Sequence, residues 1–592
     1  MRTSIATVSI SGTLTEKLNA AARAGFDGVE IFENDLLASP LTPEQIKDRA
    51  ADLGLAIYLY QPMRDIEGLP ADAFAQSLRR AEHKFRVMRR LGAETVLVCS
   101  SVSPQAVDDD ALAADQLRQL ADLASEYEIR VAYEALAWGR HVNTYDHAWR
   151  IVESVDHPSL GVCLDSFHIL ARGSDSKGIE SIPGEKIFFL QLADAPLMTM
   201  DVLQWSRHYR CFPGQGEFDL AAFVQSTVRA GYQGPLSLEV FNDIFRQADS
   251  GRTAADAMRS LVALQEAAGI TDPPAPVEPT AVAFVELVTP DTERVSTMLG
   301  ALGFTRAGKH TSKPVDLWEQ GGARILVNTA PATGRGSLSL AAVGLESPDP
   351  AAASKRAESM EAPVLPRRSS GRDILIDAVA APDGTELFFC ATDRPNLPNW
   401  LNDFQQVPHC SGGGGCVVGV DHVALTQPWH QYDEAILFYR SVIGLQPHDS
   451  VDVRDPYGLR RSRAVSTVDG GVRIALSIAP APTDSGTASQ HIALATDDII
   501  SASRRLRDTG RLLPVPDNYY DDLAARFEFG PGELETYREL GILYDRDESG
   551  QFRHCYTSTI GNVFFELVQR DEGYRGFGEQ SAHIRLTAQL AR

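Results

Sequence analysis

The sequence has 592 residues, of which 44% are hydrophobic and 23% are charged. At about 150 residues per domain, this length predicts three or four folding units, and the composition is ordinary for soluble globular proteins. The formal net charge of −24 disfavours nucleic acids and anionic membrane surfaces as partners, because both are polyanions.

The seven cysteines are scattered along the chain and odd in number. They favour buried free thiols in a reducing compartment over a disulfide framework. The N-terminal segment MRTSIATVSISGTLTEKL predicts a strand and a helix and lacks the apolar core of a signal peptide. No apolar run approaches the roughly 18 residues of a membrane span. We therefore expect a cytoplasmic protein, and we expect it to form a homo-oligomer.

Residues 1–270 alternate between short apolar runs and amphipathic helical stretches. The predicted strands cover 3–10, 27–32, 55–60, 95–100, 129–135, 160–165, 186–194 and 234–241. Continuous apolar strands separated by helices indicate a parallel sheet buried on both faces. Eight such units in about 250 residues match a (β/α)₈ barrel. We therefore predict an α/β fold whose N-terminal TIM barrel spans 1–270.

The pattern changes after residue 270. Residues 271–281 are rich in proline and predict a linker. Beyond them, short strands such as AVAFVELVT and DHVALT alternate with helices such as EAILFYRSVIG. A strand, a helix and several further strands, repeated, predict an α+β domain of βαβββ modules with an internal duplication. We expect its halves at 282–395 and 418–592, joined by a connector at 396–417.

Four oxygen-bearing side chains stand at the ends of consecutive predicted barrel strands: Glu134, Asp165, Gln191 and Glu239. A single acid at a strand end is more often a helix N-cap or an ion-pair partner. Parallel barrels, however, bring the C-terminal ends of their strands together at one mouth. Three unpaired carboxylates there would repel each other and be costly to desolvate. A divalent cation removes this conflict, and oxygen-only ligands favour Mg²⁺, Mn²⁺ or Co²⁺.

The segments YEAL, LDSFHIL, FLQLADAP, HYRCFPGQGEFD and LSLEVFND resemble the sugar-phosphate isomerase/epimerase type of barrel. Within that group they are most similar to 3-dehydroshikimate dehydratases fused to a dioxygenase-like domain. The resemblance covers essentially all of residues 1–270. One departure is Gln191, which stands where a histidine ligand is commoner in the wider superfamily, and it leaves the identity of the metal open.

The resemblance implies that 3-dehydroshikimate loses water to give protocatechuate, in quinate and shikimate catabolism. A cation on the C3 ketone oxygen would stabilise the enolate formed when the C4 proton leaves. The catalytic residues would be His168, as general base, and the metal ligand Glu134. Arg64 and Arg210 are the candidate clamps for the substrate carboxylate. The candidate partners of the ring hydroxyls are Tyr60, Ser206 and His208.

One alternative stays within the same class of barrel. A sugar or inosose isomerase or epimerase normally needs a second acid across the substrate, and Glu134 together with Glu239 could supply it. The sequence alone does not separate this activity from dehydration.

His422, His491 and Glu566 each lie in a predicted strand of the last segment. Two imidazoles and one carboxylate form the facial triad of non-haem Fe(II) oxygenases, so we expect a second divalent cation here, Fe²⁺ or Mg²⁺. GVDHVAL, QHIALATDDII, VPDNYYDDL, FFELVQR and GYRGFG resemble 4-hydroxyphenylpyruvate dioxygenase, which has the vicinal oxygen chelate fold. The half at 282–395 has Glu286 and Glu386 but no histidine in equivalent strands, and it is expected to be scaffold.

The second half departs from that dioxygenase family in two places. SIAPAPTDSG replaces an Asn-containing substrate segment, and EQSAH follows GFG where the family has Gly-Asn-Phe. A metal site with a lost or altered substrate is therefore expected, without strong activity on 4-hydroxyphenylpyruvate. Two alternatives remain open: the chain is principally a dioxygenase with an accessory barrel, or its second half is a non-catalytic assembly module.

Overall fold

The computed structural model describes the whole chain except residues 330–337, 367–370, 372, 408–414, 456–457, 480–488, 572 and 591–592, and the side chains of residues 246 and 590. The chain forms two compact units, Met1–Pro273 and Pro274–Arg592. Within the described residues, no helix is both long and apolar enough to cross a membrane. Most of the segment SIAPAPTDSG lies outside the described residues, as does the centre of the predicted connector.

The first unit is a closed barrel whose eight strands follow one another in sequence order, each parallel to its neighbours. The strands are β1 (Thr3–Ala6), β2 (Gly28–Phe32), β3 (Ala56–Met63), β4 (Thr95–Cys99), β5 (Arg130–Glu134), β6 (Leu160–Asp165), β7 (Ile187–Leu192) and β8 (Leu236–Leu238). All eight lie where the sequence predicts strands, which confirms the TIM barrel. The first is shorter than expected because residues 7–9 turn into a 3₁₀ helix.

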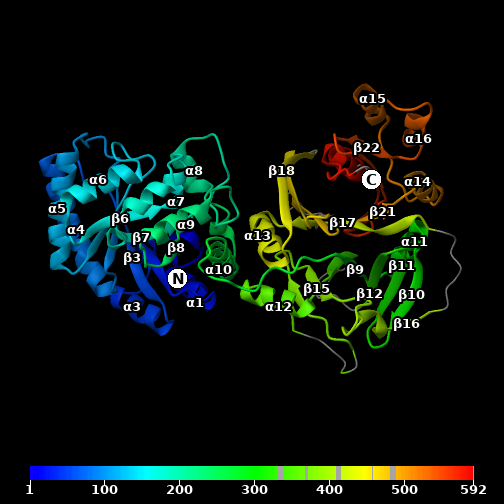
Figure 1. The fold of residues 1–592 in the computed structure, drawn as a ribbon, viewed down its shortest axis with the longest axis horizontal. Helices are drawn as coiled ribbons and strands as arrows, with labels where there is room; N and C mark the ends of the chain where they lie inside the picture. The colour runs from blue at the N-terminus through cyan, green and yellow to red at the C-terminus, as the bar shows by residue number, and fades with distance from the viewer. Residues whose placement is uncertain are drawn as a thin grey trace. The chain divides into compact units, whose positions relative to one another are not determined.

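Helices follow the strands and form the outer layer of the barrel, as Figure 1 shows. They are α1 (Leu14–Arg23), α2 (Glu33–Ala38), α3 (Pro43–Asp52), α4 (Ala71–Leu91), α5 (Asp110–Glu126), α6 (Tyr145–Val155), α7 (Ser166–Leu170), α8 (Val202–His208), α9 (Leu220–Arg229) and α10 (Ser250–Ala267). Their ends carry the expected signals. Thr13 and Glu16 form a capping box at the start of α1, and Gly92 ends α4 with a φ of 80°.

The barrel has two hydrophobic layers because side chains alternate across each strand. Leu59, Leu97 and Ala132 pack in a cluster with other inward-facing residues. Tyr60, one residue on from Leu59, instead packs in the larger cluster between strands and helices. This alternation decides which residues of a strand can reach the barrel interior.

The second unit contains two mixed sheets of eight strands, in the orders β14-β15-β13-β9-β12-β11-β10-β16 and β18-β19-β20-β17-β21-β24-β23-β22. The first sheet contains β9 (Ala281–Val288), β10 (Thr305–His310), β11 (Val315–Gln320), β12 (Ala323–Asn328), β13 (Ser339–Glu346), β14 (Ala378–Ala380), β15 (Glu386–Cys390) and β16 (Phe404–Gln406). The second contains β17 (Val417–Gln427), β18 (Gln446–Asp455), β19 (Gly458–Ser466), β20 (Arg473–Ile478), β21 (Gln490–Thr496), β22 (Leu543–Arg546), β23 (Gln551–Tyr556) and β24 (Val563–Asp571). The helices are α11 (Thr292–Leu302), α12 (Pro350–Ser359), α13 (Tyr432–Phe438), α14 (Ile499–Asp508), α15 (Asp517–Arg526), α16 (Glu533–Glu539) and α17 (Ala582–Leu590).

In each sheet a strand is followed by a helix and then by further strands, and this order occurs twice. The predicted α+β architecture of repeated modules is therefore confirmed. In the second sheet, β21 lies between β17 and β24, antiparallel to the first and parallel to the second. These three neighbouring strands carry His422, His491 and Glu566.

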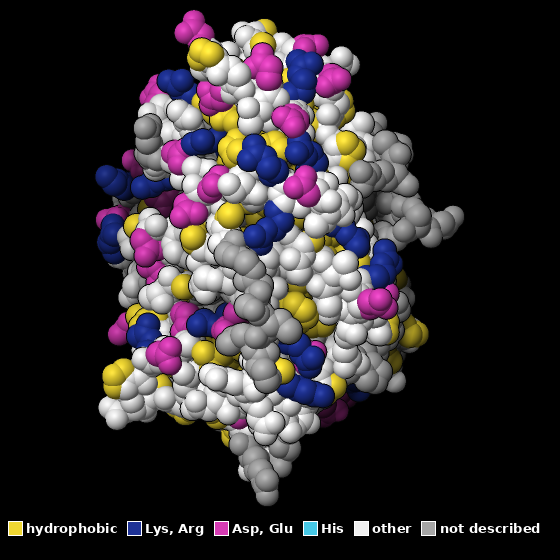
Figure 2. Space-filling model, turned by 90° about the vertical axis from the view of Figure 1, so that its right-hand side faces the viewer, with side chains coloured by type: hydrophobic (Ala, Val, Ile, Leu, Met, Phe, Trp, Pro, Cys, Tyr) yellow, Lys and Arg dark blue, Asp and Glu magenta, His cyan; other side chains and the backbone are white. Residues whose placement is uncertain are grey.

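The surface shown in Figure 2 carries Lys and Arg side chains interspersed among Asp and Glu. A basic stripe along one face is typical of nucleic-acid-binding proteins, and the described residues on this face form none.

Candidate active site and second metal centre

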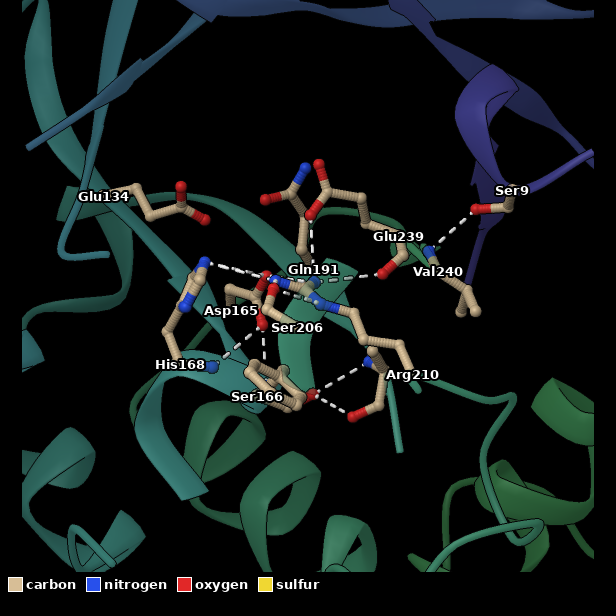
Figure 3. A network of polar contacts seen from close by, with 12 residues as sticks. Ser9, Glu134, Asp165, Ser166, His168, Gln191, Ser206, Arg210, Glu239 and Val240 are labelled. Carbon is tan, nitrogen blue, oxygen red and sulfur yellow. Dashed lines mark hydrogen bonds and ion pairs between the residues drawn. The ribbon is translucent and has the colours of Figure 1, made fainter. Parts of the chain in front are cut away.

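Four of the predicted ligands come together at the mouth of the barrel. Glu134 ends β5, Asp165 ends β6, Gln191 lies near the end of β7, and Glu239 directly follows β8. Each is at most 4% exposed, and Figure 3 shows the four side chains turned toward one another. A cavity of about 890 Å³ opens at this end of the barrel, and its lining includes Glu134, His168, Arg210 and Glu239.

Two of the proposed ligands lie close to each other and to the proposed base. One ligand atom each from Glu134, Asp165 and His168 lie within 4.8 Å of one another. Glu239 is linked to this group through Arg210, whose Nη1 donates to Asp165 Oδ2 at 2.7 Å and to Glu239 Oε2 at 3.1 Å.

The carboxylates at the mouth contain more negative charge than their protein partners neutralise. Burial, followed by the charges of Asp165 and Glu239, raises the pKa of Glu134 well above its ordinary value. Glu134 Oε1 is buried and has no hydrogen-bond partner among the described residues. Such an oxygen is costly unless something positive or donating meets it. The residues present therefore fit a divalent cation.

Asp165 combines a structural role with its place at the mouth. Its Oδ1 caps α7 by accepting hydrogen bonds from the backbone of Phe167 at 2.6 Å and of His168 at 3.3 Å. Burial alone would raise its pKa, but the charge of Arg210 and the hydrogen bonds from Arg210 and the His168 backbone hold the pKa below the ordinary value. The N-cap explanation and the ligand explanation thus apply to different oxygens of the same side chain.

His168 follows Asp165 on α7 and is only 4% exposed. Its ring packs edge-on against Trp138, with centroids 4.9 Å apart. Burial together with the positive charges of Arg210 and Arg64 lowers the pKa of His168 to about 3, although Asp165 opposes this. His168 is therefore neutral at pH 7. The backbone N–H of Ala137 lies 3.2 Å from Nδ1, and Arg210 Nη2 lies 3.2 Å from Nε2.

The two candidate clamps differ in how they are engaged. Arg210 is 1% exposed, and besides the two carboxylates it donates to Ser206 Oγ through Nε and Nη2, at 3.1 and 2.9 Å. The side chain of Arg64 also lines the cavity, but within the described part of the chain its guanidinium has no hydrogen-bond or ion-pair partner. Arg64 is therefore a cation at the mouth whose guanidinium, among the described residues, is free to bind an anion.

The three remaining candidates lie in different environments. Ser206 is buried and lines the cavity beside Arg210. His208 also lines it, with Nδ1 2.7 Å from Asp243 Oδ2. The structure does not bring Tyr60 to this lining. Its hydroxyl donates to Glu33 Oε1 at 3.1 Å in the layer between strands and helices.

The second sheet of the C-terminal unit brings His422, His491 and Glu566 together. The two Nε2 atoms lie 3.2 Å apart, and Glu566 Oε2 lies 3.3 Å from the first and 3.2 Å from the second. Three atoms of the kind that ligate transition metals thus converge in a buried place. These residues fit a metal ion.

Neighbouring side chains hold this triad in orientation. Asp421 Oδ1 lies 2.7 Å from His422 Nδ1, which leaves His422 Nε2 to face the centre. His554 Nδ1 lies 2.6 Å from Glu566 Oε1, which leaves Oε2 to face it. Carboxylate–histidine pairs of this kind fix the tautomer and the direction of metal ligands.

Sequence reasoning missed three buried polar residues around the two centres: Glu30, Asp421 and His554. For Glu30 a signal was present, since an acid inside the apolar strand DGVEIF is unusual. Asp421 directly precedes a proposed ligand. Nothing in the local pattern distinguishes His554 from an ordinary strand histidine.

The chain matches the models of three protein families. Residues 18–264 match the xylose isomerase-like TIM barrel. Residues 274–391 match the N-terminal model of hydroxyphenylpyruvate dioxygenase, and residues 419–548 match the glyoxalase/bleomycin resistance protein/dioxygenase superfamily.

Similar proteins include the 3-dehydroshikimate dehydratase of Pseudomonas putida, which is 43% identical over 99% of this chain and 98% of its own length. The chain belongs to the 3-dehydroshikimate dehydratase family. A solved structure of a xylose isomerase-like TIM barrel/4-hydroxyphenylpyruvate dioxygenase fusion protein is 42% identical, has a TM-score of 0.91 and covers 100% of this chain and 99% of its own.

The 4-hydroxyphenylpyruvate dioxygenase of Pseudomonas aeruginosa is 30% identical, over 50% of this chain and 89% of its own length. The dehydratase relative matches both units, whereas the dioxygenase relative matches about half of the chain. Dehydratase family membership therefore accounts for more of the sequence than the alternatives of a dioxygenase with an accessory barrel or a barrel isomerase.

Proposed function

We propose that the barrel catalyses the dehydration of 3-dehydroshikimate to protocatechuate. The observation that carries this is the grouping of three carboxylates, one amide and one neutral imidazole at the strand ends of a barrel from the dehydratase family. The substrate is a small carboxylate with a ketone and two hydroxyls. It thus presents an acidic proton, a leaving hydroxyl and an anionic handle to residues at one mouth.

We infer that Glu134, Asp165, Gln191 and Glu239 hold the divalent cation of the barrel, Mg²⁺, Mn²⁺ or Co²⁺. When bound, this cation would supply positive charge to the ketone oxygen as the enolate forms. The protein's contribution is a buried oxygen-donor set whose charge is only partly neutralised by Arg210.

His168 is the proposed general base. The C4 proton of the substrate passes to the imidazole of His168. The C5 hydroxyl then takes up a proton and leaves as water. Transfer of a C6 proton to the ketone oxygen completes the aromatic ring of the product. The low pKa keeps the imidazole unprotonated in the free protein. A base with this pKa is weak at pH 7, but the charge of Arg64 is one cause of the low value, so a substrate carboxylate bound to Arg64 would raise the pKa of His168. Since neutral imidazole accepts only one hydrogen bond, it cannot accept from both Ala137 and Arg210 in the geometry observed. Base catalysis at Nε2 requires the tautomer with its proton on Nδ1, and therefore release of the bond from Ala137.

We infer that Arg64 binds the substrate carboxylate. Its guanidinium is unpaired among the described residues and lines the cavity, whereas Arg210 is engaged with Asp165, Glu239 and Ser206. Charge-assisted hydrogen bonds from a guanidinium suit a carboxylate better than those from any other side chain. Arg210 then neutralises part of the charge of the ligands Asp165 and Glu239. Ser206 and His208 remain the candidates to hydrogen-bond the ring hydroxyls of the substrate.

We further propose that His422, His491 and Glu566 bind a second divalent cation, Fe²⁺ or Mg²⁺, independently of the barrel. Support comes from the close convergence of their ligand atoms and the similarity of this half to a dioxygenase. The substrate of that half, the cytoplasmic location and the homo-oligomeric state stay predictions.

Incubation of the purified full chain with 3-dehydroshikimate tests the proposed function. We expect stoichiometric protocatechuate, recognised by its ultraviolet absorbance and proton NMR spectrum. Unchanged substrate, or an isomer that retains both hydroxyls and the ketone, would overturn the assignment in favour of inactivity or of the isomerase alternative.

A further inference from the structure

Glu30 is the centre of a hydrogen-bonding network beside the proposed barrel ligands. It lies in β2, is fully buried, and its two oxygens receive three donors. Gln191 Nε2 donates to Oε2 at 2.6 Å and Gln61 Nε2 donates to the same oxygen at 2.8 Å. The hydroxyl of Ser237 donates to Oε1. A buried carboxylate with three donors from three other strands is a built arrangement rather than an incidental contact.

The bond to Gln191 fixes which end of that amide faces the ligand group. An amide has one oxygen, which can ligate a hard cation, and one NH₂ group, which only donates. The two ends are nearly equal in size, so packing alone does not distinguish them. With Nε2 held on Glu30, Oε1 must point to the opposite side, where the thiol of Cys163 approaches at 3.5 Å.

The hydrogen bond from Gln61 connects Glu30 to a second proposed metal ligand, Glu239. Gln61 lies in β3, lines the cavity and is 1% exposed. Its side chain also hydrogen-bonds to Glu239, which favours the ionised form of that carboxyl and opposes the effect of burial on its pKa. Glu30 therefore contacts one proposed ligand directly and reaches another through one intervening amide.

We propose that Glu30 is a positioning residue that makes Gln191 an oxygen ligand. This inference rests on the proposed cation site of the barrel. Glutamate suits the position because its Oε2 accepts from the amides of Gln191 and Gln61 at once, while its Oε1 meets the hydroxyl of Ser237. Glutamine at residue 30 would present its own NH₂ to one of these donors, and the Gln191 amide would no longer be held in one orientation.

The direct test measures Mn²⁺ binding to the metal-free full chain by calorimetry and by the Mn²⁺ EPR signal. Glu30→Gln is expected to weaken the barrel site by about 10- to 100-fold, the usual effect of removing a partner of a metal ligand. Glu67→Gln is the matched control, since Glu67 is also buried in this unit but bonds to Ser101 and Tyr133 instead. It should leave the Mn²⁺ affinity unchanged.

Two further variants separate positioning from a merely structural effect. In a Gln191→Ala background, adding Glu30→Gln should cause a much smaller loss of affinity than in wild type, because only the indirect route through Gln61 to Glu239 then remains. The exchange Glu30→Gln with Gln191→Glu conserves charge, reverses the hydrogen bond and presents a carboxylate oxygen, so it should recover most of the affinity. If Glu30→Gln alone does not fold, the Mn²⁺ affinity of this double variant still tests the inference.

Equal Mn²⁺ affinity in wild type and Glu30→Gln would overturn the inference while leaving the proposed function standing. The same loss with and without Gln191 would overturn it too, since Glu30 would then act by another route. Absence of Mn²⁺ binding by the barrel of the wild-type chain would overturn both the inference and the proposed cation site.

Discussion

Arg210 and Asp165 form a fully buried ion pair at the centre of the barrel mouth, with Nη1 2.7 Å from Oδ2. The same guanidinium also meets Glu239. The pair thus brings a fixed positive charge into direct contact with two of the proposed cation ligands.

Replacing Arg210 by Ala should destabilise the barrel by about 3–5 kcal/mol, because it leaves buried carboxylates uncompensated. A bound cation supplies charge to the same group and stabilises the folded state. The loss in unfolding temperature, measured by calorimetry, should therefore be smaller with saturating Mn²⁺ than with a chelator. An equal loss in both conditions would show that the cation does not meet these carboxylates.

His168→Ala should lower kcat by roughly 10² to 10⁴, the usual contribution of a general base. Mn²⁺ affinity should stay close to that of wild type, because the four oxygen ligands are retained. Steady-state kinetics and calorimetry on the same preparation check both expectations. An unchanged kcat would remove His168 from the mechanism.

Arg64→Ala should raise KM for 3-dehydroshikimate by about 10- to 100-fold, since hydrogen bonds to charged groups contribute about 1.5–3 kcal/mol. Arg64→Lys should recover part of the loss. The control is Arg207→Ala, an exposed arginine on the lining of the same cavity, for which KM should be nearly unchanged. A large rise in KM for Arg207→Ala and none for Arg64→Ala would show that Arg207, and not Arg64, binds the substrate carboxylate.

Glu67 gives the barrel a pH-dependent stability. Burial raises its pKa from 4.5 to about 7 in the folded protein, although bonds from Ser101 and Tyr133 oppose this. The folded state therefore favours the protonated form, whose stabilising contribution is complete below pH 4.5 and lost as pH rises through about 7. The shift corresponds to about 3 kcal/mol.

Glu67→Gln should thus be more stable than wild type at pH 8 and about equal to it at pH 4, because its neutral amide has no proton to lose. Calorimetric scans of both proteins across this range check the prediction. A stability difference that does not change with pH would contradict it.

His422→Ala should leave dehydration measurable, since His422 belongs to the C-terminal unit and the proposed active site to the barrel. Metal analysis should find one divalent cation fewer per chain than in wild type. Complete loss of dehydration in this variant would show that the two centres depend on each other.

The ends of the barrel strands could be predicted from the sequence because parallel strands are continuous apolar runs whose ends are abrupt. Glu134 and Asp165 each close such a run, and the structure places them together. The direction of each side chain was harder to predict. Tyr60 and Gln61 are adjacent, and alternation sends Gln61 into the barrel and Tyr60 toward the helices.

Contacts between distant segments could not be predicted. The sequence indicates that Arg210 is a candidate cation near the site, but not that Asp165 and Glu239 would engage its guanidinium and leave Arg64 free. The network of Glu30 joins residues 31 and 161 positions apart. Such partners follow from barrel closure, which no local pattern reveals.

A cation held by Glu134 and its neighbours is proposed to support dehydration in the barrel. The most direct measurement is the rate of protocatechuate formation before chelation, after removal of metal, and after Mn²⁺ is restored, with Glu134→Ala alongside. We predict loss of turnover on chelation, its return with Mn²⁺, and none at any stage in the variant. Full turnover by the metal-free chain, or by Glu134→Ala, would contradict the account.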